Sequence, residues 1–185
     1  PMVTGAMDMM LSGEFGNATL CALKAPFLKP GTLYLEAIFV VSCAAPRYLQ
    51  IPRYIPQGTI RVVVDRECKD LSSVLTQERI NAIVGPIKKR VAHEVAKHSR
   101  SEINAMADRA TKIAQAQLSP LVDIARHDIE TEQRAELERL QALAAVNPNI
   151  RAEEIDYREH FADQLLSHVE HTQLKLDAVR VGLAT

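Results

Sequence analysis

The sequence predicts an α+β fold, in which a small antiparallel β-sheet packs with two or three long amphipathic helices that form a helical hairpin. Six of the nine prolines, five of the seven glycines and six of the eight aromatic residues lie before residue 71. Beyond that point the chain is rich in Ala, Leu, Ile, Glu, Lys, Arg and Gln. Turn formers and aromatic residues are typical of strands and loops, whereas the second set favours helices. We therefore expect a strand-rich part over residues 1–70, long helices over 71–171 and a return strand over 172–185.

Two strands open the first part. Residues 17–24 carry Ala and Leu side chains on alternating faces, which predicts a strand. Residues 32–43 are apolar on both faces, which predicts a central strand of a sheet that is covered on two sides. Lys29-Pro30-Gly31 is a turn signal in the short connection between them. We expect these two strands to form an antiparallel hairpin.

The loop that follows is rich in proline, and it holds Pro46, Pro52 and Pro56. Proline cannot donate a ladder hydrogen bond, so regular strand pairing is not expected there. Residues 59–65 predict the third strand. At the end of the chain, residues 174–183 alternate before an apolar tail, and we prefer a strand that returns to the sheet over a continued helix.

The second part has a helical period from about Thr76. Apolar side chains recur every three or four positions at Ile80, Val84, Ile87, Val91 and Val95, and the pattern continues to Gln117. Gly85-Pro86 delays the proper start of this helix to that point. Pro86 would then lie in the first turn, where proline is well tolerated. Ser119-Pro120 is either the beginning of a second helix or a kink in one long helix.

Two further amphipathic stripes follow. The first consists of Leu121, Ile124, Ala125, Ile129, Leu137, Leu140 and Leu143, and it ends at Asn147-Pro148-Asn149. The second belongs to a helix expected over residues 152–171, with Ile155, Phe161, Leu165, Leu166 and Val169 facing inward.

Composition limits the class of protein. The chain has 185 residues, of which 47% are hydrophobic and 24% charged, with a formal net charge of −1. These values are typical of a folded globular chain without a polyanionic or histone-like tail. Its three cysteines fit no zinc or CxxC spacing, and no apolar run is long enough to span a membrane, so we expect a soluble cytoplasmic protein. The chain starts at Pro1 and is apolar and compatible with a helix over residues 2–11, so we expect a piece of a longer polypeptide.

Catalytic motifs are absent from the sequence. It contains no GxxxxGK[ST], GxGxxG or GxSxG pattern, and no spacing selects a nucleophile. His93-Glu94 with His98 is one residue longer than a HExxH zinc motif, which puts the two imidazoles about 140° apart on a helix. His160, His168 and His171 share one helix face within about 80°, but surface histidines are the simpler interpretation. We expect no catalytic residue, no metal and no cofactor in this chain.

Charge is distributed unevenly along the chain. Between Arg79 and Lys112 eight basic residues face three acids, and between Asp123 and Asp177 thirteen acids face six bases. One interpretation is that these regions neutralise each other. The other is that a basic stripe faces solvent and contacts phosphates or an acidic protein surface, because its members fall within about 80° on a helical wheel: Lys89, His93, Lys97 and Arg100. No aromatic residue is interleaved with them, so base stacking is not expected.

Three stretches resemble a known family: Gly5 to Lys24, Lys29 to Val41, and Ala145 to Arg151. Together they resemble the C-terminal region of the RapA family of bacterial RNA polymerase-associated proteins. The resemblance implies a much longer protein with an N-terminal, helicase-like Swi/Snf ATPase motor, which uses ATP and Mg²⁺, binds RNA polymerase and promotes its recycling. The motor's nucleotide motifs are missing here, so no active-site residue carries over.

Two functions follow from these observations. The first is a noncatalytic accessory or regulatory module of an ATP-driven transcription factor, with RNA polymerase and the ATPase domains of the same chain as partners. The second is a module that contacts DNA or RNA through the basic stripe. Membrane partners are not expected.

Overall fold

The computed structural model describes residues 18–24, 28–55 and 58–185. The helix expected over residues 2–11 lies outside this range. The described residues form two compact units. The first comprises the chain up to Val40 with Thr59–Ala116 and Lys175–Thr185, and the second comprises Val41–Gly58 with Gln117–Leu174.

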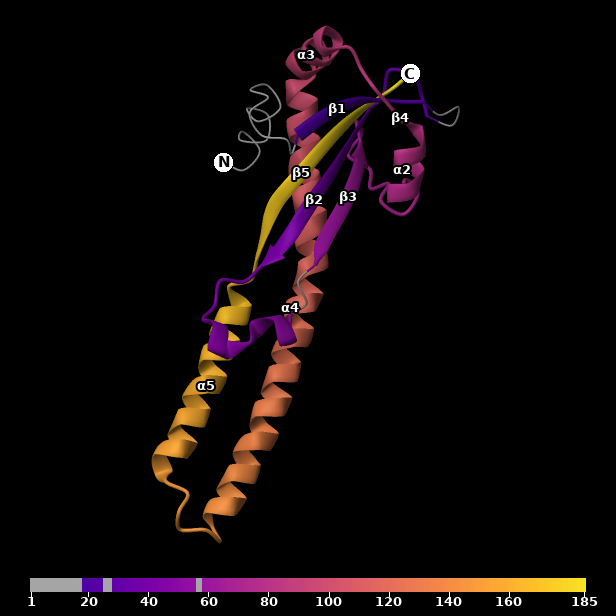
Figure 1. Cartoon of the computed structure of the whole chain (residues 1–185). Helices are drawn as coiled ribbons and strands as arrows, with labels where there is room; N and C mark the ends of the chain where they lie inside the picture. The colour runs from indigo at the N-terminus through magenta and orange to yellow at the C-terminus, as the bar shows by residue number, and fades with distance from the viewer. Residues whose placement is uncertain (1–17, 25–27, 56–57) are drawn as a thin grey trace. The chain divides into compact units, whose positions relative to one another are not determined.

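A mixed five-stranded sheet dominates the first unit (Figure 1). The strand order is β3-β2-β5-β1-β4. The strands are β1 (Ala18–Leu23), β2 (Leu33–Ser42), β3 (Thr59–Asp65), β4 (Val84–Gly85) and β5 (Gln173–Ala184). The α+β class, the three early strands and the return strand at the end of the chain are confirmed, and β3 has the expected bounds.

The expected hairpin between β1 and β2 is wrong. Strand β5 lies between them and pairs with β1 in parallel, with Thr19 opposite Arg180 and Cys21 opposite Gly182. At its other edge, Ala184 accepts from the Gly31 amide at 2.8 Å and donates to the Thr32 carbonyl at 2.9 Å. The end of β5 therefore meets the start of β2, and the two strands run antiparallel (Figure 1). The sheet is mixed because the last segment of the chain fills its centre.

The helical stretch expected from about Thr76 is divided among three helices. Helix α2 (Gln77–Ile83) begins after Thr76, whose side chain accepts from the Arg79 amide at 3.4 Å. The chain then forms β4 and helix α3 (Lys89–His98), which ends at Ser99. Helix α4 (Arg100–Ala144) begins immediately afterwards. The expected start at Gly85-Pro86, with Pro86 in the first turn, is wrong, because the chain is already helical from Gln77 and Pro86 lies before the N-cap of α3. The unbroken helix from there to Gln117 is wrong too.

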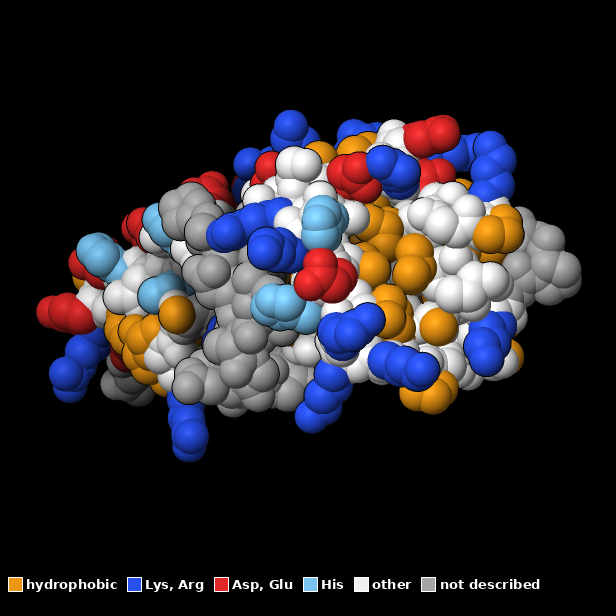
Figure 2. All heavy atoms as spheres, turned by 90° about the horizontal axis from the view of Figure 1, so that it is seen from above, with side chains coloured by type: hydrophobic (Ala, Val, Ile, Leu, Met, Phe, Trp, Pro, Cys, Tyr) orange, Lys and Arg blue, Asp and Glu red, His pale blue; other side chains and the backbone are white. Residues whose placement is uncertain are grey.

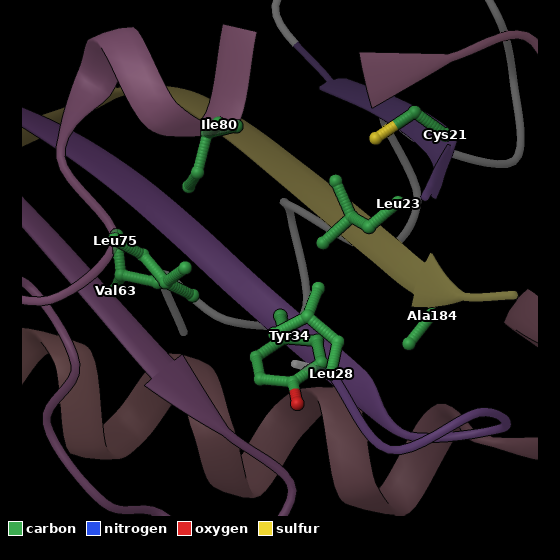
Figure 3. Close-up of a cluster of buried hydrophobic side chains, with 8 residues drawn as sticks. All are labelled: Cys21, Leu23, Leu28, Tyr34, Val63, Leu75, Ile80 and Ala184. Carbon is green, nitrogen blue, oxygen red and sulfur yellow. The ribbon is translucent and has the colours of Figure 1, made fainter. Parts of the chain in front are cut away.

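The core of the first unit lies on both faces of the sheet. One cluster joins the strands to α2 and the loop before it, and Figure 3 shows its members: Cys21, Leu23, Leu28, Tyr34, Val63, Leu75, Ile80 and Ala184. Strand residues alternate between faces, so Leu35, Ala37 and Phe39 share a different face from Tyr34. Figure 1 shows α4 behind the sheet, where Ile103 and Met106 are buried. At Gly182 an added Cβ would lie 2.4 Å from the Leu23 side chain, so packing requires glycine there.

A helical hairpin dominates the second unit. It consists of residues 117–144 of α4 and helix α5 (Ala152–Glu170), which lie side by side in Figure 1. Helix α4 continues through Pro120, so one long helix is the correct alternative. Two short 3-10 helices, η1 (Arg47–Leu49) and η2 (Ile51–Arg53), belong to the same unit and replace the proline-rich loop. They contact the hairpin through Tyr48, which donates to Gln164 at 2.7 Å, and Tyr54, which donates to Glu132 at 3.0 Å.

The buried face of this hairpin differs from the expected stripe. Ala125, Ile129 and Gln133 are buried, whereas Leu121, Ile124 and Leu143 are exposed by 37%, 59% and 40%. On α5, the expected Leu165 and Val169 are buried, and Ile155, Phe161 and Leu166 are half-buried. Spacing alone did not show which apolar residues of α4 would find a packing partner.

Candidate functional site

The expected basic stripe lies on α3 and at the start of α4. Lys89, His93, Lys97 and Arg100 are all exposed, as expected. The neighbouring Lys88 and Arg90 are exposed too. Figure 2 shows Lys, Arg and His side chains together on the face seen from above. We call Lys88, Lys89, Arg90, His93 and Lys97 the basic surface.

The stripe does not follow one continuous helix. Ser99 separates Lys97 from Arg100, so the helical wheel does not relate these two residues. Arg100 also interacts with other residues of the chain. The buried side of α3 is formed by Ala96, whereas Val91 is 41% exposed. The basic surface is therefore confined to α3 and the residue before it.

The charges of the basic surface have few internal partners. Among the described residues, Lys89 and Lys97 take part in no ion pair or hydrogen bond, and the nearby Glu94 carboxylate lies 3.4 Å from His98 Nδ1. Elsewhere in the first unit, Arg66 pairs with Glu102. Within the second unit, Glu132 pairs with Arg53 at 2.8 Å. With respect to the part of the chain that the structure describes, the basic surface thus presents unpaired positive charge that could bind an anionic partner.

Four of the six histidines contact backbone carbonyls. Nδ1 of His160 lies 2.8 Å from the Asp156 carbonyl, and Nδ1 of His171 lies 2.6 Å from that of Ser167. His168 turns instead to the loop before η1, where its Nδ1 lies 3.1 Å from the Ala44 carbonyl. His98 Nδ1 contacts the Glu94 carbonyl at 2.8 Å. Within the described part of the chain, no three His, Cys, Asp or Glu residues are grouped as a metal site requires.

The three cysteines are free thiols in separate places. Cys21 is buried in the core of the first unit, and burial raises the pKa of its thiol. Its Sγ lies 3.6 Å from the Val181 carbonyl. Cys43 lies in the second unit, 3.0 Å from the His168 carbonyl. A raised pKa keeps a thiol protonated and weakly reactive, so Cys21 acts as a core residue.

A buried carboxylate in the sheet is a feature that the sequence analysis missed. Glu36 of β2 is only 4% exposed. One of its oxygens accepts from Arg61 Nε of β3 at 2.5 Å, and the other lies 3.4 Å from Arg180 Nε of β5. Arg61 also donates to the Leu75 carbonyl at 2.7 Å, and Arg180 to Asn81 of α2 at 3.2 Å. The sequence did contain a signal for this network. It was a single acidic residue inside an apolar strand, together with one arginine in each of two other expected strands.

A small cavity of about 210 Å³ adjoins this carboxylate, and it is lined by Thr19, Glu36, Ile38, Asp177, Ala178, Val179 and Arg180. Both arginines pair with Glu36, so its carboxylate links β2 to β3 and β5, and Arg180 extends the network to α2. We therefore interpret the network as structural. No described helix is both long and apolar enough to cross a lipid bilayer.

The chain is similar to known proteins over its whole length. Residues 1–184 match the family model described as "RNA polymerase recycling family C-terminal". All 185 residues align with relatives named "RNA polymerase-associated protein RapA", at 32% identity in Pectobacterium atrosepticum, 34% in Erwinia tasmaniensis and 31% in Yersinia pestis. The chain spans 19% of the length of each of these relatives. It therefore belongs to the RNA polymerase recycling family, and it corresponds to the C-terminal region of those proteins.

Proposed function

We propose that this chain is the noncatalytic accessory module of an RNA polymerase-associated, ATP-dependent transcription factor that promotes polymerase recycling in the cytoplasm. The observation that carries the proposal is the family match over residues 1–184, together with relatives named for their association with RNA polymerase. ATP and Mg²⁺ would be used by ATPase domains elsewhere in the full-length protein, and those domains are the second expected partner.

The described residues support a binding role better than a catalytic one. Four of the six histidines contact backbone carbonyls, the buried Glu36 carboxylate pairs with two arginines, and the buried Cys21 thiol has a raised pKa. Phosphoryl transfer needs a phosphate cradle and a carboxylate that holds Mg²⁺. The chain by itself should therefore hydrolyse no nucleotide.

Binding to core RNA polymerase tests the proposal. The purified chain, immobilised through one terminus, should retain core polymerase at about 0.15 M salt, and a globular protein of similar size and charge serves as the control. Failure to retain polymerase over a range of salt concentrations would contradict the proposal. ATP turnover that copurifies with the chain would contradict its noncatalytic part.

Contact with DNA or RNA is the second candidate function, and the unpaired charge of the basic surface favours it. Each lysine that neutralises a phosphate should contribute about one unit to the slope of log affinity against log salt. Replacing Lys89 and Lys97 with Glu should therefore weaken DNA or RNA binding and lower that slope by about two. Arg100 is left unchanged because it interacts within the chain. Polymerase binding that falls while nucleic-acid binding is unchanged would assign the basic surface to the protein partner.

A further inference from the structure

The free end of the helical hairpin exposes apolar side chains. It comprises the last turns of α4, the loop over residues 145–151 and the first turns of α5, and we call it the hairpin tip. Val146 is 79% exposed, Tyr157 66% and Leu143 40%. Single exposed apolar residues are ordinary on protein surfaces, but several that adjoin one groove indicate a binding surface.

The groove lies between the two helices of the tip. It has a volume of about 610 Å³ and is lined by Leu140, Arg151, Glu153, Glu154, Tyr157 and Arg158. Tyr157 lines the groove, and the exposed Leu143 is one helical turn after Leu140, so these two exposed residues adjoin the groove, whereas Val146 follows in the loop of the tip. A tyrosine and two arginines are residue types that frequently supply binding energy at protein interfaces.

The tip is ordered before any partner binds. The Asn147 amide donates to the Leu143 carbonyl at 2.9 Å, and the Ile150 amide donates to the Asn147 carbonyl at 3.2 Å. The Arg151 amide donates to Glu154 Oε1 at 3.3 Å, which closes the first turn of α5. These bonds fix the loop, so a partner would not have to order it and affinity would not be lost to that entropy.

One donor beside the groove lacks an acceptor. Arg158 lies with its guanidinium carbon 5.3 Å from the centre of the Phe161 ring, which holds the side chain in place. Its Nε is buried and has no hydrogen-bond partner among the described residues. A buried Nε is out of reach of an acceptor on a binding partner, so Arg158 contributes to the groove through its place in the lining and its contact with Phe161.

The charge around the groove selects the class of partner. Between Glu136 and Glu159 there are six acids and three bases. Arg139 pairs with Glu136 and lowers the pKa of that carboxyl, whereas the carboxylates of Glu153 and Asp156 make no ion pair or hydrogen bond with any described residue. The lining of the groove is balanced, with two arginines and two glutamates, but the tip around it carries a net charge of −3 over residues 136–159. This negative rim repels phosphates and anionic lipid, and it also repels the same tip of a second copy. It attracts a protein surface that is rich in Lys and Arg.

We infer that the hairpin tip docks onto a basic protein surface that inserts an apolar side chain into the groove beside Tyr157. The inference rests on the proposed function, and it names the tip as the part of this chain that the polymerase binds. The carboxylates of Glu153 and Asp156 meet lysines or arginines of the partner around the apolar centre. Complementary charge of this kind fixes the orientation of the complex and accelerates association.

Three variants test the inference. The first combines Val146→Ser with Tyr157→Ala and removes apolar surface. The second combines Glu153→Lys with Asp156→Lys and reverses the rim charge. The matched control is Ile124→Ser, which changes another exposed apolar residue, 59% accessible, on α4 that lies sixteen residues, or about 24 Å, before Leu140. Circular dichroism and thermal melting confirm that each variant folds, and the charge variant removes no apolar contact.

Affinity for core RNA polymerase is measured for each variant at two salt concentrations. We expect the apolar variant to bind at least about tenfold more weakly, the charge variant to lose affinity mainly at low salt, and the control to stay within about twofold. Normal binding by both tip variants would overturn the inference and leave the proposed function intact. Equal losses in all three variants, or loss only of self-association or DNA binding, would also overturn it. A wild-type chain that binds no polymerase would overturn both.

Discussion

The two units of this chain use charge in different ways. In the first unit, Glu36 is buried between two arginines from neighbouring strands of the sheet. In the second unit, the ion pairs Arg53–Glu132 and Arg126–Asp123 are largely exposed, with arginine side chains 62% and 49% accessible. Buried charge is costly unless every partner is present, whereas exposed pairs add little stability.

Apolar residues show the same contrast. Strands β2, β3 and β5 leave none of their apolar side chains exposed, whereas the hairpin leaves Ile124, Leu143, Val146 and Tyr157 exposed. The first unit is therefore built for stability around a central strand. The second presents apolar and charged groups to the outside, which supports the proposed binding role. The experiments below test this difference between the units.

Removal of the end of the chain should have the largest effect. Deleting residues 174–185 removes β5, whose six residue pairs with β1 and whose bonds near Thr32 hold the centre of the sheet. Each of the buried Val179 and Val181 side chains contributes about 1.5 to 3 kcal/mol, and strands β1 and β2 are left without their common neighbour. We expect the cooperative unfolding transition of the chain to be lost in urea.

The control for this deletion removes Thr185 alone. This residue is exposed and makes one backbone bond, from its amide to the Leu23 carbonyl at 3.0 Å. Its removal should leave the midpoint nearly unchanged. An unchanged midpoint for the long deletion would mean that β5 does not hold the sheet together.

Neutralisation of Glu36 should have the next largest effect. Glu36→Gln leaves Arg61 and Arg180 without a carboxylate, and removing one partner from a buried pair costs about 3 to 5 kcal/mol. Because the arginine side chains are 19% and 29% exposed, we expect a loss near the lower end, about 3 kcal/mol. Asp123→Asn in the exposed pair with Arg126 is the control and should cost about 0 to 1 kcal/mol. Equal losses in urea denaturation would remove the contrast between the units.

The sequence predicted those parts of the fold that depend on local pattern. The strand over residues 59–65, the helix from Ala152 and the return strand each have a clear period and clear ends, so they were placed correctly. The order of strands was not predictable in this way, because a short link between β1 and β2 suits a hairpin as well as two strands with a third inserted between them. Strand order depends on pairing between segments that are distant in the sequence, and such pairing produces no local sequence pattern.

The interaction surfaces were predicted less completely. Lys89 and Lys97 were correctly placed in solvent because charged residues are seldom buried. The break between α3 and α4 at Ser99 was not predicted, because no glycine or proline lies beside it. The exposure of Leu143 at the hairpin tip could not be predicted either, because a helical period shows which residues share a face and not where the facing helix ends.

Loss of the Tyr54 hydroxyl should have an intermediate effect. It donates to Glu132 and accepts from Gln133 Nε2 at 3.2 Å, and Gln133 is only 5% exposed with its Oε1 already unpaired. Tyr54→Phe leaves a buried amide group without a partner and should cost about 1 to 2 kcal/mol. Tyr48→Phe, which removes an exposed bond to Gln164, is the control and should cost less.

The same hydroxyl gives a pH dependence. Burial, and then the hydrogen bond to Glu132, raise the pKa of Tyr54 above its ordinary value. A group whose pKa is raised by folding stabilises the folded state below its unfolded pKa of about 10, and this contribution is lost as the pH rises through the folded pKa. Stability measured from pH 8 upward should therefore fall less steeply in Tyr54→Phe than in the wild type. A parallel decline in both proteins would contradict this assignment.

Charge reversal on the basic surface should have the smallest effect on stability. Lys89 and Lys97 are exposed and unpaired among the described residues, so replacing both with Glu should change the free energy of unfolding by less than about 0.5 kcal/mol. The same variant should lose affinity for its anionic partner, most strongly at low salt, because screening acts over about 10 Å at 0.1 M.

Melting temperature and salt-dependent binding, measured on one preparation, separate the two interpretations of the charge distribution. A lower melting temperature with unchanged binding to polymerase, DNA and RNA would show that these lysines balance acids within the chain. An unchanged melting temperature with weaker binding would show that the basic surface acts outward.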